Sequence, residues 1–358
     1  MITSNLEVER FMTVRNEAAR LHKDALVIDS HNDAIVNHIR RGNLGFSGNP
    51  PSDGDRRNAT VAGLRGRLDR SDIESSVQID FPKMRKGGVD AAFFAVDVTL
   101  AVKNHLTYAL DAMGFFDSEM EAHGDDVVLA KSAADISRAK REGKLAVVLA
   151  IENSDGVEGS INVLRMLHRV GVRSIGLTHD VSSLAADGNA EARSRGGLTR
   201  FGVRLVEAMN NLGMLVDVSH ISEAGFWDVM AVSQKPVIAS HSNCKSVCDH
   251  PRNLSNEQIR GLAKNGGSMG ITFVPRFVDK TAPSFARLLD HVDHAVQLVG
   301  ADHVGIGSDF DGGGTLMEDA TSFALITVGL LDRGYSEADV RKILGGNHLR
   351  VFSEAVAN

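Results

Sequence analysis

The chain has 358 residues, of which 43% are hydrophobic and 24% charged, so it is long enough to bury one large core or two modest ones. The formal net charge of −7 argues against a general nucleic-acid-binding protein, because such proteins usually carry a basic face. No apolar run approaches the roughly eighteen residues of a membrane span, so we expect neither nucleic acid nor a membrane among its partners.

The N-terminal segment and the cysteines indicate where the protein works. Residues 1–24 are charged and amphipathic, which predicts a helical extension, and they lack the apolar core and small-residue cleavage site of a secretory signal. Only Cys244 and Cys248 are present, both in one short segment, which excludes a disulfide framework. We therefore expect a soluble protein of a reducing compartment, the cytoplasm.

Eight short apolar runs along the chain predict strands that are buried on both faces. Amphipathic segments at 160–171, 198–213 and 285–300, each ending at a glycine, predict helices between them. This alternation favours an α/β fold of the (β/α)8 TIM-barrel type; a doubly wound sheet is the alternative, since one or two strands can be miscounted in a single sequence. The predicted strands occupy residues 25–29, 91–98, 145–151, 174–178, 214–219, 236–240, 268–273 and 303–308.

The domain organisation predicted from composition is simple. No break in composition marks a second domain, so residues 1–358 are expected to form one barrel. The polar segment at 45–68 contains glycine and proline and follows the first predicted strand, where a barrel places a loop on its rim.

Histidines and carboxylates follow six of the eight predicted strands. Each alone would be interpreted as a helix cap or a turn residue. In a parallel barrel, however, all these positions share the C-terminal mouth, where barrel enzymes keep their catalytic residues. The chain has fourteen histidines, and four of them occur at these strand ends. The set comprises His31, Asp33, Glu152, His179, His220, His241 and Asp309.

Four histidines beside carboxylates, without usable thiols, indicate a divalent metal site of the zinc type. The groups are too many for one tetrahedral catalytic ion that keeps a position open for water, but they suffice for two ions that share a bridging carboxylate. His31 and Asp33 alternate along an extended segment, so both side chains can reach one ion. Asp29 is one residue out of step and is expected to brace the segment.

Six segments occur in the order "DSHNDAI", "AIEN", "GLTHD", "LVDVSHIS", "VIASHSNCKSVCDHPRN" and "HVGIGSDFDGG". In sequence and in order they resemble the membrane (renal) dipeptidases, a metallopeptidase group of the amidohydrolase superfamily. The resemblance extends from about residue 25 to "GGNHLRVF" at 345–352, which is nearly the whole chain. It implies a metal-dependent hydrolase barrel with two Zn²⁺ per chain.

The resemblance also implies which residues hold the two zinc ions. His31 and Asp33 match the ligands of the first ion. Glu152 matches the carboxylate that bridges both ions together with a water or hydroxide. His220 and His241 match the ligands of the second ion. Glu158 is the alternative bridging carboxylate, but Glu152 directly ends a predicted strand and has the spacing to the next histidine that the family shows.

Three further residues match family positions that act on the substrate. His179 matches the histidine that contacts the substrate and polarises the scissile carbonyl. Arg252 matches the arginine that binds the substrate's terminal carboxylate, a task suited to a bidentate guanidinium. Asp309 matches the aspartate that takes a proton from the bridging water and passes it to the leaving amine.

The expected activity is hydrolysis of dipeptides, including L-Xaa-D-Xaa, by attack of a metal-bridging hydroxide. The alternatives are cleavage of a lactone, cyclic amide or β-lactam (or a deamination) at the same metal site, and a barrel that binds metal without catalysis. The stretch after His179 and the residue Asp97, where relatives have Trp or Tyr, leave the side-chain preference open. The sequence does not show the signal, disulfides and lipid-anchor tail of the vertebrate enzymes. In this it resembles the soluble, bacterial-type members of the family. Homodimers occur in the family, so a homodimer is included among the expected partners.

Other polar clusters are not expected to form sites. Cys244, Cys248 and His250 do not have the second ligand pair of a Cys/His zinc site. His291 and His294 lie on a predicted outer helix and are expected to pack or to face solvent. The segment "DFDGGG" at 309–314 lacks the Lys and Ser/Thr of a phosphate-binding loop.

Overall fold

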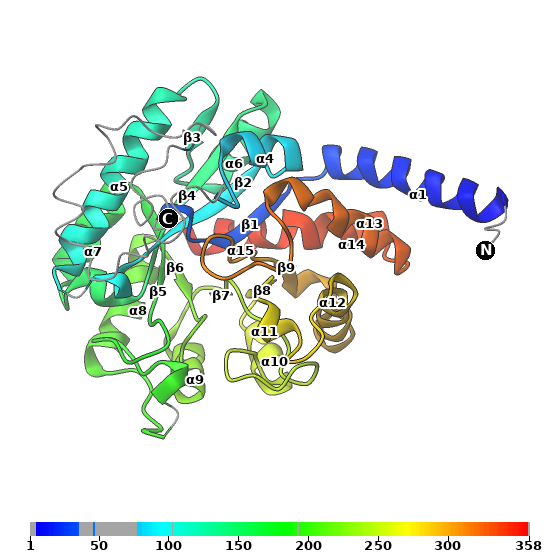
Figure 1. Cartoon of the computed structure of the whole chain (residues 1–358). Coiled ribbons are helices and arrows are strands. Elements are labelled where there is room, and N and C mark those ends of the chain that lie inside the picture. Colours follow the sequence, from blue (N-terminus) through cyan, green and yellow to red (C-terminus); the bar gives the residue numbers. More distant parts are fainter. Residues whose placement is uncertain (1–4, 36–45, 47–76, 102, 192, 357–358) are drawn as a thin grey trace.

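The computed structural model describes residues 5–35, 46, 77–101, 103–191 and 193–356. Its strands pair in parallel in a single nine-stranded sheet, which closes on itself because β2 pairs with both β1 and β4 (Figure 1). The strands are β1 (Ile28–Asn32), β2 (Ala91–Asp97), β3 (Val127–Leu129), β4 (Leu145–Glu152), β5 (Val172–Gly176), β6 (Leu215–Asp217), β7 (Ile238–Ala239), β8 (Ser268–Ile271) and β9 (Val304–Ile306).

Eight of these strands form the closed ring, in the order β1, β2, β4, β5, β6, β7, β8, β9. The short β3 lies outside this ring, beside the first half of β4, while β5 pairs with the second half of β4. The predicted TIM barrel is therefore confirmed, and the doubly wound alternative is wrong. Each predicted strand overlaps a strand of the ring. Only β3 was not predicted, because an isolated apolar run of three residues does not stand out in a sequence.

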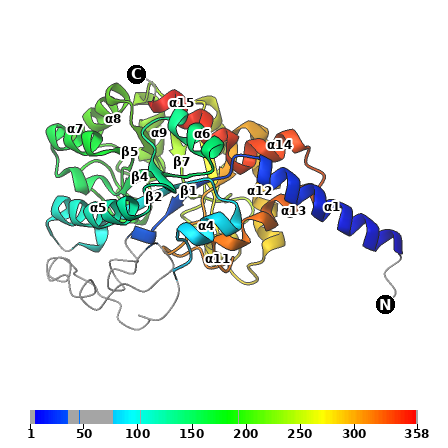
Figure 2. The same cartoon turned by 90° about the horizontal axis from the view of Figure 1, so that it is seen from above.

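Helices surround the ring (Figure 2). The predicted helices at 160–171, 198–213 and 285–300 are α7, α8 and α12; each begins after a Ser or Thr whose side chain accepts a backbone N–H, and each ends at a glycine. The described helices are α1 (Asn5–Asp24), α4 (Phe81–Gly87), α5 (His105–Ala122), α6 (Ala133–Glu142), α7 (Ile161–Val170), α8 (Arg200–Leu212), α9 (Glu223–Val232), α10 (Asn256–Lys264), α11 (Pro275–Val278), α12 (Phe285–Val299), α13 (Ala324–Asp332), α14 (Glu337–Arg341) and α15 (Asn347–Val356).

The N-terminal part of the chain forms a long helix, as expected. Helix α1 projects away from the barrel in both views (Figures 1 and 2), and near its C-terminal end Arg20 pairs with Glu337 of α14 at 2.7 Å. Among the described helices none is long and apolar enough to cross a bilayer. Apart from Phe46, which is buried, the rim loop expected at 45–68 lies outside the described residues.

Helix α15 closes the N-terminal end of the barrel. Its residue Phe352 packs in one core cluster with the strand residues Ala91 and Phe93, and the two phenyl rings lie 5.6 Å apart. Because successive side chains of a strand point to opposite faces, the residues that share the face of Phe93 point into the barrel as well. On β2 these are Ala95 and then Asp97, which lies at the opposite, C-terminal mouth.

Candidate metal centre

All seven histidines and carboxylates that were predicted from strand ends meet at the C-terminal mouth of the barrel. They form three overlapping groups in which the ligand atoms lie within 4.8 Å of one another, an arrangement that could hold metal ions. Six of the seven are buried, and His179 is half-buried. The groups are His31–Glu152–His241, Glu152–His179–His220 and His31–Asp33–Asp309.

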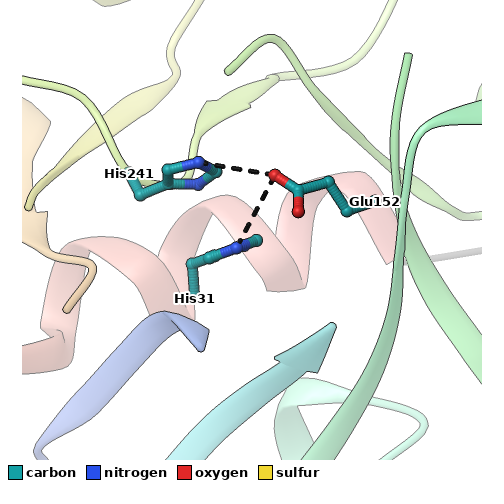
Figure 3. Close-up of side chains that lie close together, drawn as sticks. All are labelled: His31, Glu152 and His241. Carbon is teal, nitrogen blue, oxygen red and sulfur yellow. Dashed lines mark ion pairs between the residues drawn. The ribbon is translucent and has the colours of Figure 1, made fainter. Parts of the chain in front are cut away.

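Glu152, the last residue of β4, lies at the centre of the cluster. Its Oε1 atom is 3.0 Å from Nε2 of His220, 3.5 Å from Nε2 of His241 and 3.8 Å from Nε2 of His31. Figure 3 shows the rings of His31 and His241, which are stacked at 3.8 Å, both facing this carboxylate. The barrel thus directs three imidazole nitrogens toward one carboxylate oxygen.

Several of these converging atoms lack hydrogen-bond partners. Oε1 of Glu152, Nε2 of His31 and Oδ1 of Asp33 are buried and make no hydrogen bond within the described residues. Buried polar atoms are almost always hydrogen-bonded, so three orphans in one cluster need an explanation. Imidazole nitrogens and carboxylate oxygens are the ligands that zinc-type ions prefer, so these residues fit a bound divalent metal.

Surrounding groups orient two of the histidines. Nδ1 of His220 donates to Oδ1 of Asp180 at 2.9 Å. Nδ1 of His241 lies 2.9 Å from Oγ of Ser240, and that hydroxyl donates to Oδ2 of Asp217 at 2.5 Å, so it accepts from the histidine. Each ring therefore carries its proton on Nδ1 and presents the lone pair of Nε2, the form in which a histidine binds a metal.

The backbone at the mouth is strained where it positions site residues. His220 and Asp309 have φ angles of 66° and 59°, in the left-handed region that costs a non-glycine residue about 1–3 kcal/mol. The run of glycines after Asp309 has a steric role, because a Cβ atom on Gly312 would collide with the carboxylates of Asp33 and Asp309. The segment 309–314 thus leaves room for the carboxylates of Asp33 and Asp309 beside its backbone.

The electrostatics of the cluster favour a cation. Burial, and then the neighbouring charge of Asp33, raise the pKa of Glu152 and of Asp309 well above the ordinary range of carboxyl groups. Burial, and then nearby positive groups, lower the pKa of His220 and of His241 well below that of a free imidazole. Burial opposes a positive charge on His31, but the charges of Glu152 and Asp33 outweigh it and raise the pKa of His31 to about 10. The two carboxyl groups and His31 thus indicate an excess of negative charge in the cluster, which a bound cation would neutralise while it displaces protons from its ligands.

Arg252 lies beside the cluster on the segment between β7 and α10. The side chain is buried, and its Nη2 donates to the backbone oxygen of His241 at 3.1 Å. Its Nε has no hydrogen-bond partner among the described residues; the nearest carboxylate oxygen, Oδ1 of Asp180, is 3.9 Å away. A cavity of about 130 Å³ lies against Arg252 and His220, with Asn189 and Lys245 also in its wall.

Comparison with known proteins identifies the family. The family model described as "Membrane dipeptidase (Peptidase family M19)" matches residues 15–358. The chain belongs to the membrane dipeptidase family. It is therefore a metallopeptidase that hydrolyses peptide bonds, a dipeptidase, and the resemblance inferred from the six sequence segments is confirmed.

Individual relatives agree with this membership. "Dipeptidase verJ" of Clonostachys rogersoniana is 33% identical over 353 residues, which cover 94% of this chain and 86% of the relative. "Dipeptidase aclJ" of Aspergillus oryzae is 37% identical over 294 residues, covering 77% and 70% of the two chains. The crystal structure of a Rhodobacter sphaeroides metallopeptidase, liganded with a phosphinate mimic of the dipeptide L-Ala-D-Ala, has a TM-score of 0.77 at 23% identity and covers 93% of this chain and 100% of its own; it shows the same fold.

Two supporting residues of this dipeptidase were not anticipated from its sequence. Asp180 directly follows His179, but its hydrogen bond joins it to His220, forty positions further along the chain, and no sequence pattern indicates that pairing. Asp217 lay inside the strand predicted at 214–219, and nothing in the sequence indicated its contact with Ser240. Asp29 was expected to brace β1, and it does: its carboxylate accepts the backbone N–H and the hydroxyl of Ser308, both at 2.7 Å.

The groups that were not expected to form sites remain outside the centre. Cys244 and Cys248 are buried free thiols, and burial raises the pKa of Cys244 to about 12. His291 is fully buried and hydrogen-bonded at both ring nitrogens, so of the two expected roles it has the packing role. His294 is half-buried and contacts Asn256 at 2.8 Å.

Proposed function

We propose that this protein is a binuclear zinc dipeptidase whose substrates include L-Xaa-D-Xaa dipeptides. The observation that carries the proposal is the position of Glu152, whose Oε1 faces three imidazole nitrogens at 3.0–3.8 Å without a hydrogen bond. We assign the ligands of one ion as His31 and Asp33, those of the other as His220 and His241, and the bridging carboxylate as Glu152.

The number of converging groups supports two ions rather than one. Glu152 belongs to two of the three clustered groups and His31 to two, so the clusters are linked through shared residues. A single tetrahedral ion would leave several of the buried polar atoms without a partner. Two zinc ions at these ligands would activate a water for attack on the scissile carbonyl carbon and polarise the carbonyl oxygen.

We assign Asp309 to proton transfer and His179 to stabilisation of the negative charge that develops on the carbonyl oxygen. Asp309 lies in the same group as His31 and Asp33, and burial raises its pKa, so its carboxylate can accept the proton of the attacking water and return it to the nitrogen of the leaving amine. His179 stacks on His220 at 4.2 Å and lies within the Glu152 group, where its ring can donate a hydrogen bond to the carbonyl oxygen as negative charge develops there.

Arg252 is assigned to the terminal carboxylate of the substrate. It is a buried guanidinium with an unused N–H, and it borders a cavity that adjoins the proposed metal ligand His220. A planar guanidinium binds a carboxylate through two parallel hydrogen bonds. This anchor favours a dipeptide over the lactone or cyclic-amide substrates of the alternative amidohydrolase hypothesis, since those need no free carboxylate at this position.

The remaining expectations stay predictions. The alternative of a barrel that binds metal without catalysis is set aside, because the chain belongs to a family of dipeptidases. A cytoplasmic location is consistent with the two free thiols, and the homodimer expected from the family stays a prediction.

The test combines metal analysis with a substrate panel. We expect two zinc ions per chain, turnover of L-Ala-L-Ala and L-Ala-D-Ala, and tight binding of the phosphinate mimic of L-Ala-D-Ala. Fewer than one zinc per chain, or two bound ions without turnover of any L,L or L,D dipeptide, would contradict the proposal.

Arg252→Ala tests the carboxylate anchor. The loss of a charge-assisted, bidentate contact should lower kcat/KM for free dipeptides at least about a hundredfold, while leaving the slow cleavage of the matching dipeptide amides unchanged. Arg252→Lys keeps the charge and should recover part of the loss. Equal effects on dipeptides and on their amides would favour a substrate without a free carboxylate.

A further inference from the structure

We propose that Asp97 binds the α-ammonium group of the dipeptide, on the side of the barrel mouth opposite Arg252. The inference rests on the proposed dipeptidase function and adds to it the group that recognises the amino end of the substrate. Asp97 belongs to none of the three clustered groups that could hold metal, so it is free for this role.

The register of the sheet places Asp97 in the mouth. Asp97, the last residue of β2, pairs directly with Glu152, the last residue of β4. Directly paired residues of parallel strands point to the same face, and the floor cluster around Phe93 shows that this face of β2 is the barrel interior. Both carboxylates therefore lie in the uppermost layer of the barrel interior, and Figure 3 shows the ends of the neighbouring β1 and β2 directed toward the cluster around Glu152.

Half of the Asp97 carboxylate is engaged and half is available. Oδ1 accepts the backbone N–H of Thr99 at 2.9 Å and its hydroxyl at 2.5 Å, which fixes the orientation of the side chain. For Oδ2 no hydrogen bond is found within the described residues, although the residue is only 7% exposed. A turn-capping role explains the contacts of Oδ1 and leaves Oδ2, on an oriented side chain, open to a group that enters the mouth.

No fixed cation of the protein neutralises this carboxylate. Among the described residues Asp97 forms no ion pair with a lysine or arginine. Burial raises its pKa, the neighbouring His179 opposes that effect, and the charge of Asp33 adds to it. A buried carboxylate at the barrel mouth without a lysine or arginine partner is suited to bind a cationic group of the ligand.

The ring order places the two proposed anchors on opposite sides. Asp97 ends β2, whereas Arg252 follows β7, and four steps around the eight-stranded ring separate these strands in either direction. The site around Glu152 lies between them. A zwitterionic dipeptide with its carboxylate at Arg252 and its ammonium at Asp97 would carry its single peptide bond across the proposed metal centre. Two anchors on opposite sides of the mouth would also favour dipeptides over longer peptides, because a longer peptide cannot place both charged ends.

The test compares two substrates that differ only in the amino group. L-Ala-D-Ala has the ammonium, whereas N-propionyl-D-Ala has a hydrogen in its place. Asp97→Asn should lower kcat/KM for L-Ala-D-Ala by about ten- to a hundredfold, mainly through KM, because a charge-assisted contact is lost. Cleavage of N-propionyl-D-Ala should change less than about threefold. The matched control is Asp117→Asn on α5, an exposed aspartate, which should change neither rate.

Binding provides a second measurement that does not depend on turnover. The metal-loaded wild type should bind the phosphinate mimic of L-Ala-D-Ala more tightly than the same compound without its amino group, and Asp97→Asn should remove most of that preference. Equal losses for both substrates and both phosphinates would show a purely structural Asp97 and overturn the inference. A loss confined to Lys-Xaa substrates would also overturn it, since the acid would then bind a side chain. If the wild type cleaves no dipeptide, the proposed function fails, and the phosphinate pair still decides whether Asp97 recognises an ammonium group.

Discussion

This barrel contains two sets of three histidines that are equally buried but differ in their hydrogen bonds. His31, His220 and His241 lie at the C-terminal mouth. His22, His291 and His348 lie elsewhere, at helix packing contacts and at the floor of the barrel. All six are at most 8% exposed.

The histidines away from the mouth have partners for both ring nitrogens. His348 lies 3.1 Å from the hydroxyl of Ser268 and 3.2 Å from the backbone oxygen of Ile306. His22 contacts a hydroxyl and a backbone oxygen, and His291 contacts a backbone N–H and a backbone oxygen. At the mouth, by contrast, Nε2 of His31 has no partner in the described part of the chain, and the Nε2 atoms of His220 and His241 face each other at 2.8 Å. The two sets therefore differ in whether both ring nitrogens are hydrogen-bonded, and not in burial. The histidines with unpaired nitrogens are the candidate metal ligands, and those with two partners stabilise the fold.

The largest effect on activity is expected from Glu152→Gln, which replaces the carboxylate that the histidines of the mouth surround. Loss of the proposed bridging carboxylate should lower kcat/KM by more than about a thousandfold and reduce the zinc content. The metal-free variant should unfold at the same temperature as the metal-free wild type, or higher, because a buried carboxylate among other carboxylates is removed. Activity, metal analysis and calorimetry measure the three quantities.

A lower unfolding temperature of metal-free Glu152→Gln would contradict this expectation. It would mean that Glu152 stabilises the fold as His348 does, and the distinction between the two regions would fail.

His348→Ala makes the corresponding change at the floor. Removing this ring leaves a cavity next to Gly305 and leaves the carbonyl of Ile306 and the hydroxyl of Ser268 without their partner. The free energy of unfolding should fall by about 2–4 kcal/mol. Chemical denaturation measures this loss, while kcat/KM of the folded, metal-loaded variant should stay within about threefold of the wild type. A selective loss of zinc in this variant would show that the floor and the mouth are coupled.

The buried histidines away from the mouth should also make the stability of the fold depend on pH. Burial lowers the pKa of His291 and of His348 to about 4, and it also lowers that of His22. The folded state therefore binds fewer protons than the unfolded state, so the stability that these residues contribute is present above pH 6.5 and is lost as the pH falls toward 4. His291 and His348 should each contribute a slope of about 1.4 kcal/mol per pH unit in that window.

The variant His348→Gln isolates one of these slopes. Glutamine can hydrogen-bond but does not titrate, so the difference in unfolding free energy between wild type and variant should narrow steadily from pH 7 to pH 4.5. A difference that does not depend on pH would show that His348 is not held in its neutral form. Comparing the two proteins in this way cancels the opposing titration of Glu152 and Asp309 at the mouth.

Much of the fold and of the candidate site was predictable because both depend on short-range patterns. Strands that are buried on both faces are continuously apolar, so all eight ring strands were found, and a polar residue after an apolar run is visible in any sequence. The parallel barrel then brings those strand ends together without further information.

What the sequence could not provide depends on contacts between distant segments. The pairing of His220 with Asp180, and the hydroxyl of Ser240 between His241 and Asp217, depend on how loops fold over the mouth. Asp97 was recognised as unusual, but only the register with Glu152 shows which face it occupies. The role of Gly312 likewise depends on how closely the carboxylates of Asp33 and Asp309 approach its backbone.

The position of α15 has a consequence for how this chain folds. The helix packs against residues of β1 and β2 at the N-terminal end of the barrel. The backbone of Gly345, just before the helix, lies against Leu26 and Ile28. The contacts of Gly345 join segments more than three hundred residues apart. Such long-range contacts slow folding because a large loop must close before they form. The apolar floor stays open to water until residues 345–356 have docked. We therefore expect the last step of folding to be the seating of α15, and a chain that stalls before it to expose an apolar surface on which it aggregates.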